Sequence, residues 1–109
     1  MMYVDFSAGG KDYKLRLNTR STVQLEKQLG CNPLSIFGAG DTIPTITTLV
    51  HILHCAMQPF NHSVTLQDAY NIMDEWLDEG NVITDFLKIV IEVYKVSGLI
   101  KVEDNAEKN

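Results

Sequence analysis

Three potential metal ligands lie close together in the middle of the sequence, as His51, His54 and Cys55. On a helix, spacings of three and four residues place such side chains on one side, where a zinc ion could bind them. We place all three opposite the apolar stripe of their helix. A zinc site needs further ligands, and the sequence has no other cysteine or histidine pair at a ligand spacing. We therefore interpret them as a polar helix face and expect no metal and no other cofactor.

The acidic side chains within residues 68–79 form the second group that could take part in catalysis or binding. General acid–base catalysis needs carboxylates with separated pKa values in a cleft, and an exposed helix face provides neither. No Ser/His/Asp arrangement or activated cysteine is evident, so we expect no enzyme activity. The face is either simply solvated or a docking site for a basic partner, with Asp74 and Asp78 as candidate contacts. The five acidic residues are Asp68, Asp74, Glu75, Asp78 and Glu79.

The last long segment, 81–98, is apolar over most of its circumference, whereas a surface helix needs an apolar stripe only a little over ~100° wide. One stripe holds Ile83, Phe86, Leu87, Val90 and Tyr94. Two interpretations of the second stripe remain open. It is buried under the N-terminal residues, or it is exposed for self-association or for holding an apolar segment of another chain. The second stripe holds Val82, Ile89, Val93, Val96 and Ile100.

Composition and charge limit the kinds of partner. With 45% apolar and 21% charged residues among 109, the chain is expected to fold as one globular domain. The net charge is −5, and no lysine or arginine occurs between Lys27 and Lys88, so nucleic-acid binding is disfavoured. No apolar run approaches the ~20 residues of a membrane span, and no secretory signal is present. Cys31 and Cys55 are expected to be free, buried thiols in a reducing cytoplasm.

The elements that position these residues follow from local patterns. Residues 2–8 and 12–17 alternate polar and apolar side chains around Gly9-Gly10, which predicts a β-hairpin with one buried face. Helical periodicity and capping residues predict the helices that follow. We expect an α+β fold, mainly helical, in which about four helices pack around the C-terminal one. The expected helices are 19–30, 33–37, 45–57, 65–79 and 81–98, within a single domain at 1–100 followed by a flexible polar tail at 101–109.

Several of these segments together resemble the tail assembly chaperones of long-tailed bacteriophages and prophages, especially those of Gram-positive hosts. The likeness covers roughly residues 13–99, and its motifs are helix caps and core positions. The matching residues are Leu25-Glu26-Lys27-Gln28-Leu29-Gly30, Asn32-Pro33-Leu34, 49–56, Thr65-Leu66 with Ala69, Asp74, Leu77, Glu79 and Gly80, and Tyr94-Lys95-Val96-Ser97-Gly98-Leu99.

The resemblance implies a protein that acts during tail assembly and is absent from the finished virion. Such chaperones coat the helical, apolar tape measure protein and give way when tail tube subunits polymerise around it. The implied partners are the tape measure protein, the major tail tube protein and further copies of the chain, in the cytoplasm of the bacterial host. The resemblance supplies no active-site residues.

Many phages of this family also make a longer product by ribosomal frameshifting, so two interpretations of the tail remain open: an ordinary hydrophilic terminus, or the place of such a frameshift. Codons GAA-AAA-AAC for Glu107-Lys108-Asn109 would contain the slippery run A-AAA-AAC, and sequencing the gene tests this. A rival function from another class is a small adaptor or antitoxin-like module that binds one protein partner. A metal-dependent enzyme that uses His51, His54 and Cys55 is a more distant alternative.

Overall fold

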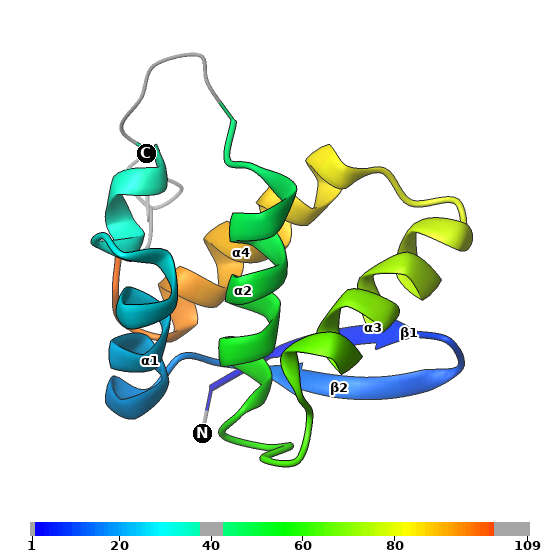
Figure 1. The fold of residues 1–109 in the computed structure, drawn as a ribbon, viewed down its shortest axis with the longest axis horizontal. Coiled ribbons are helices and arrows are strands. Elements are labelled where there is room, and N and C mark those ends of the chain that lie inside the picture. The colour runs from blue at the N-terminus through cyan, green and yellow to red at the C-terminus, as the bar shows by residue number, and fades with distance from the viewer. Residues whose placement is uncertain (1, 38–42, 102–109) are drawn as a thin grey trace, which may run out of the picture.

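The structure is a computed structural model that describes residues 2–37 and 43–101. It contains an N-terminal β-hairpin followed by four α-helices and a short 3₁₀ helix, as Figure 1 shows. The predicted α+β, mainly helical fold is therefore confirmed. The loop expected around 38–41 and the polar tail after Lys101, with its proposed frameshift residues, lie outside the described part of the chain.

The hairpin pairs β1 (Val4–Ala8) with β2 (Lys11–Leu15) in an antiparallel register. Gly9 and Gly10 form the turn with φ angles of 60° and 78°, which favour glycine because it has no Cβ. Alternation along the strands buries Phe6, Ala8 and Leu15 under the helices. The predicted hairpin with one buried face is thus confirmed.

Three of the four α-helices begin with a side-chain cap. Such a cap stabilises the helix because the first backbone N–H groups of a helix have no partner inside it. Asn18, Thr45 and Thr65 accept hydrogen bonds from the backbone of the first turns that follow them. Gly30 ends the first helix in the left-handed conformation, as its position predicts. The helical elements are α1 (Thr19–Leu29), η1 (Pro33–Phe37), α2 (Ile46–Met57), α3 (Leu66–Asp78) and α4 (Ile83–Val96).

Helix α2, rather than the C-terminal helix, lies at the centre of the fold. It packs against α1 on one side, α3 on the other, and α4 and β2 behind, as Figure 1 shows. Eight of its 12 residues are buried. Its apolar surface therefore extends well beyond the stripe that the sequence predicted, which explains its central place. Helix α4 crosses behind α2 and also contacts β1.

Three aromatic side chains from different elements form the middle of the core. The ring of Trp76 lies 5.8 Å from that of Phe6 and 5.6 Å from that of Phe86. Leu53 is fully buried in the same cluster, and Leu77 packs against it from the side. Their places on the apolar faces of consecutive helices predict that Leu53, Trp76, Leu77 and Phe86 share one core, and the core cluster confirms this.

The connection between β2 and α1 ties the ends of two helices together. The backbone N–H of Arg16 donates to the carbonyl of Ala56 at 2.9 Å, and its guanidinium donates to the carbonyl of Val96 at 2.9 Å. The N–H of Leu17 donates to the hydroxyl of Ser97 at 2.8 Å. The C-terminal ends of α2 and α4 are therefore held beside the hairpin. In the described residues, no helix is long and apolar enough to cross a membrane.

Candidate functional site

The histidine–cysteine cluster of α2 lies inside the molecule, so its placement on an outward polar face was wrong. His51 is half-buried, while His54 and Cys55 are buried. Gln28 of α1 meets two of the three: its Oε1 pairs with His51 Nδ1 and accepts from Cys55 Sγ at 3.7 Å. The cluster therefore joins α1 to α2. Within residues 2–37 and 43–101, no group of three potential ligands is placed to hold a metal ion.

The two thiols differ in exposure. Cys55 is buried, as expected, and burial raises its pKa to about 12, which keeps the sulfur protonated and unreactive at neutral pH. Cys31 is exposed, so its expected burial was wrong. It follows the end of α1, where the chain turns outward before η1. Both cysteines are free.

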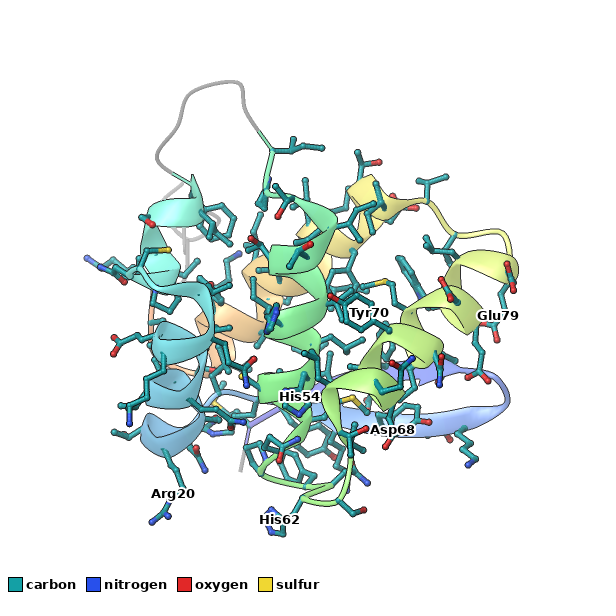
Figure 2. The ribbon with its side chains drawn as sticks, in the orientation of Figure 1. Arg20, His54, His62, Asp68, Tyr70 and Glu79 are labelled. Carbon is teal, nitrogen blue, oxygen red and sulfur yellow. The ribbon has the colours of Figure 1, made fainter. Side chains whose placement is uncertain are left out.

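His54 stands out because it is only 7% exposed and its Nδ1 has no hydrogen-bond partner among the residues that the structure describes. Burial lowers its pKa, against a smaller opposing effect of the Val64 backbone, and nearby His51 and Asp68 contribute less. Figure 2 shows the side chain near the end of α2, toward the start of α3. A neutral imidazole is thus part of the packing between these two helices.

The acidic residues of α3 divide into two sets. Asp68 caps its own helix, accepting from the Thr65 backbone N–H at 2.9 Å. Glu75 lies against the hairpin turn, and Glu79 accepts from the Gly9 backbone N–H at 2.7 Å. These three carboxylates therefore contact either their own helix start or the hairpin turn.

Asp74 and Asp78 form the second acidic set. Both are exposed, and neither makes a hydrogen bond or ion pair with any residue that the structure describes. They lie one helical turn apart, so their side chains share a face of α3. These are the two acidic residues that the sequence analysis proposed as partner contacts, and the structure leaves them accessible.

The second stripe of α4 is not continuous on the surface. Val93 is 1% exposed, so its expected contact with a partner is wrong: it is a core residue beneath its neighbours. Ile89, Val96 and Ile100 are half-buried. Val82 alone is largely accessible, at 55%. The stripe is interrupted because α4 packs against α2 and β1, which bury part of it.

A different apolar surface lies at one end of the molecule, where α2 and α4 both begin (Figure 1). Ile43, Ile46 and Val82 are 52%, 56% and 55% exposed there. We call these three residues the apolar end. The helical spacing of Ile46 with Leu49, Val50 and Leu53 predicts that it belongs to the buried stripe of α2, but the buried residues of the helix begin only at Leu49. Sequence periodicity could not have revealed this, because it says nothing about where packing stops.

Val82 in the apolar end occupies an unusual position. It is the N-cap of α4 and makes no side-chain cap hydrogen bond, unlike the residues that begin α1, α2 and α3. Valine is a poor N-cap, costing about 1 kcal/mol relative to threonine or serine. An exposed apolar residue therefore stands where a polar one would stabilise the helix.

A wide-open surface hollow of about 850 Å³ lies along α1 and was not anticipated from the sequence. Arg20 and Lys27 line it, with Val23 between them. Their spacing of three and four residues could have revealed the shared face. Among the residues that the structure describes, those lining it are Asn18, Thr19, Arg20, Val23, Gln24 and Lys27.

The fold is a small α+β domain that is mainly helical. The chain belongs to a family of unknown function, DUF6096, whose sequence model matches residues 5–109. Comparisons with curated proteins and with solved structures gave no match.

Proposed function

We propose that this protein is a tail assembly chaperone of a long-tailed bacteriophage or prophage, acting in the cytoplasm of the bacterial host. Its role would be to hold apolar helical segments of the tape measure protein until tail tube subunits replace it. The sequence resemblance suggests this function. The apolar end gives it a physical basis, because holding such a segment requires accessible apolar side chains on a rigid frame.

The observation that carries the proposal is Val82. A valine at an uncapped N-cap lowers the stability of α4, and its side chain, which is 55% exposed, does not belong to the hydrophobic core. Residues that lower stability without a structural return are typical of binding surfaces. Ile46, the first residue of α2, is another exposed apolar residue at a helix start, with 56% of its surface accessible. Both begin helices whose remaining turns are well packed, so the contact surface is held rigidly.

The decisive experiment is co-purification with the tape measure protein encoded in the same phage genome. The wild-type chain is co-expressed with it, and the recovered complex is measured. The double variant Ile46→Gln/Val82→Ser removes apolar surface and places a good N-cap residue at α4. We expect it to lose most of the complex while its thermal stability stays equal or rises. Loss of binding could then not be attributed to unfolding.

Val23→Gln is the matched control, because Val23 is also an exposed valine on a helix, but on α1 at 42% exposure. It should leave tape measure binding unchanged. If wild type does not bind the tape measure protein, or if the double variant binds as well as wild type, the proposal is wrong. Recovery of a single different protein partner, in a pattern that the double variant abolishes, would instead favour the adaptor or antitoxin-like alternative.

A further inference from the structure

The β-hairpin has an unpaired edge along β2. The sheet that the structure describes has only two strands, so each strand pairs on one side alone. Ala8 and Lys11 flank the two-residue turn and so form a hydrogen-bonded pair. The alternation of an antiparallel ladder then turns the backbone N–H and C=O groups of Asp12 and Lys14 away from β1. Among the described residues, none of these groups has a hydrogen-bond partner, so the edge is open to a further strand.

The open edge ends where β2 meets α2. The next N–H on the same side of the strand belongs to Arg16, because alternate residues direct their backbone groups to the same edge. This N–H donates to the carbonyl of Ala56 at 2.9 Å. Helix α2 therefore takes the place of a partner strand at Arg16, and the accessible part of the edge lies within Lys11–Leu15.

An open hollow of about 670 Å³, which we call the β2 hollow, lies between this edge and α3. Lys11, Asp12 and Tyr13 line it from β2, and residues of α3 and of the loop before α3 line the other side. Figure 2 shows Asp68 near the start of α3, beside the hairpin. Side chains of a strand alternate between the two faces of a sheet. Every second side chain of a strand added along β2 would therefore enter the β2 hollow.

The β2 hollow combines apolar side chains with carboxylates. Ile72 is only 7% exposed and Val64 is half-buried. Asp68 and Glu75 also line the hollow and are exposed. Burial raises the pKa of the Tyr13 hydroxyl, and the negative charges of Glu75 and Asp68 raise it further, so both carboxylates act on the space beside β2. A lysine or arginine suits this place, because its apolar stem can pack on Ile72 while its charged end reaches a carboxylate.

We propose that the edge of β2 binds an extended segment of another protein by strand addition, with a lysine or arginine of that segment in the β2 hollow. The backbone hydrogen bonds supply affinity, and the hollow selects the basic side chain. This inference goes beyond the proposed function and does not depend on it, because its residues are separate from the apolar end formed by Ile43, Ile46 and Val82.

The probe is a synthetic eight-residue peptide that alternates valine and lysine, with blocked ends and a fluorescent label. The full-length protein is titrated into it at low salt, and fluorescence anisotropy is measured. A matched peptide of alternating valine and glutamate should bind at least about tenfold more weakly. The valine–lysine peptide with every backbone nitrogen methylated keeps its charge but cannot donate to β2, so its affinity should also fall by at least about tenfold.

Amide hydrogen exchange, measured by NMR, locates the contact on the protein. Saturating valine–lysine peptide should slow the exchange of the Asp12 and Lys14 N–H groups by at least about tenfold, because they become paired. The N–H groups of Asp5 and Ser7 point outward from β1, on the opposite edge of the hairpin, and their exchange should not change.

Two proline variants separate the two edges. Asp12→Pro removes an outward N–H from β2, and Ser7→Pro removes the outward N–H of the opposite residue in β1. Both also remove the hydrogen bond of 2.7 Å from the Ser7 hydroxyl to the Asp12 carboxylate, so their effects on the hairpin are matched. Asp12→Pro should weaken binding of the valine–lysine peptide by at least about tenfold, and Ser7→Pro should leave it within about twofold of wild type.

Two charge variants test the β2 hollow without changing the backbone. Asp12→Asn/Glu75→Gln removes two carboxylates that line the hollow and should weaken binding several-fold. Asp5→Asn/Glu92→Gln removes the same number of negative charges from other exposed positions and should leave binding within about twofold of wild type. Circular dichroism checks that every variant keeps the fold.

Four results would overturn the proposal. Wild type could fail to bind the valine–lysine peptide. It could bind without slower exchange at Asp12 and Lys14, which would mean that net charge alone attracts the peptide. The two variants of a matched pair could weaken binding equally. The Asp12 and Lys14 N–H groups could be protected in the protein alone, increasingly so at higher concentration, which would mean that a second copy covers the edge.

Discussion

The hydroxyl of Tyr94 donates a hydrogen bond of 3.0 Å to the backbone carbonyl of Pro33, inside the protein. The two residues are 61 positions apart and belong to two of the segments that carry the resemblance to tail assembly chaperones. Tyr94 is fully buried, and the ring of Phe37 packs edge-on against it at 5.4 Å. The bond anchors η1 to α4, so these two segments act as one structural unit.

Tyr94→Phe removes that hydroxyl and leaves the Pro33 carbonyl without its partner in a buried place. We expect the free energy of unfolding to fall by about 1–3 kcal/mol in urea titrations. Tyr70→Phe is the matched control, since Tyr70 is 37% exposed, and it should change stability by less than about 0.5 kcal/mol. Equal effects of the two substitutions would contradict a structural role for the bond.

Val82→Thr should stabilise the protein. The substitution is close to isosteric and would give α4 the sequence Thr-x-x-Asp, with Asp85 in the place that Asp68 has in the capping box of α3. We expect a gain of about 1 kcal/mol in the free energy of unfolding.

Val23→Thr is the control for this gain, because Val23 lies inside α1, where a hydroxyl has no capping role. Valine and threonine have similar helix propensities, so its effect should be close to zero. If Val82→Thr gives no gain over Val23→Thr, the new hydroxyl does not cap α4.

Substituting Val93 and Val23 by aspartate tests which of these two valines belongs to the core. Val93→Asp places a charge at a position that is 1% exposed, with no partner for it, and should cost several kcal/mol and abolish a cooperative thermal transition. Val23→Asp, at a position that is 42% exposed, should leave the transition in place. A folded Val93→Asp protein would mean that this turn of α4 is accessible in solution.

Stability should depend on the protonation of His54. Its pKa in the folded protein lies below the ordinary value of 6.5, chiefly because it is buried. The unfolded chain therefore binds more protons than the folded one when the pH lies near or below 6.5, so stability is fully present above that pH and is lost as the pH falls toward the folded pKa. The free energy of unfolding, measured at several pH values between 8 and 5, should decrease in this window.

His54→Gln removes this titration and should make that decrease shallower. His62→Gln is the control, because His62 is exposed in the loop between α2 and α3, and it should keep the wild-type pH dependence. An unchanged slope in His54→Gln would show that other groups cause the decrease.

Local sequence patterns determined most of the elements. Asn18, Thr65 and Gly30 could be assigned as caps because a helix end has a fixed set of unpaired backbone groups, which only certain residues satisfy. Gly9-Gly10 predicted the hairpin turn for a similar reason, since positive φ angles favour glycine. Alternation then predicted which strand residues face inward. Each of these relationships joins residues that are near one another in the chain.

Only the tertiary structure decided which surfaces are covered. Val93 and Val82 belong to the same helical stripe, yet one is buried and the other accessible, because Val93 lies within α4, which packs against α2 and β1, whereas Val82 only precedes the helix as its N-cap. The sequence predicted Cys55 and His54 on a polar face, but α1 and α3 pack against α2 on both sides, and both residues are buried. Burial depends on packing between elements that are distant in sequence, and a periodic pattern within one helix carries no information about where its neighbours end.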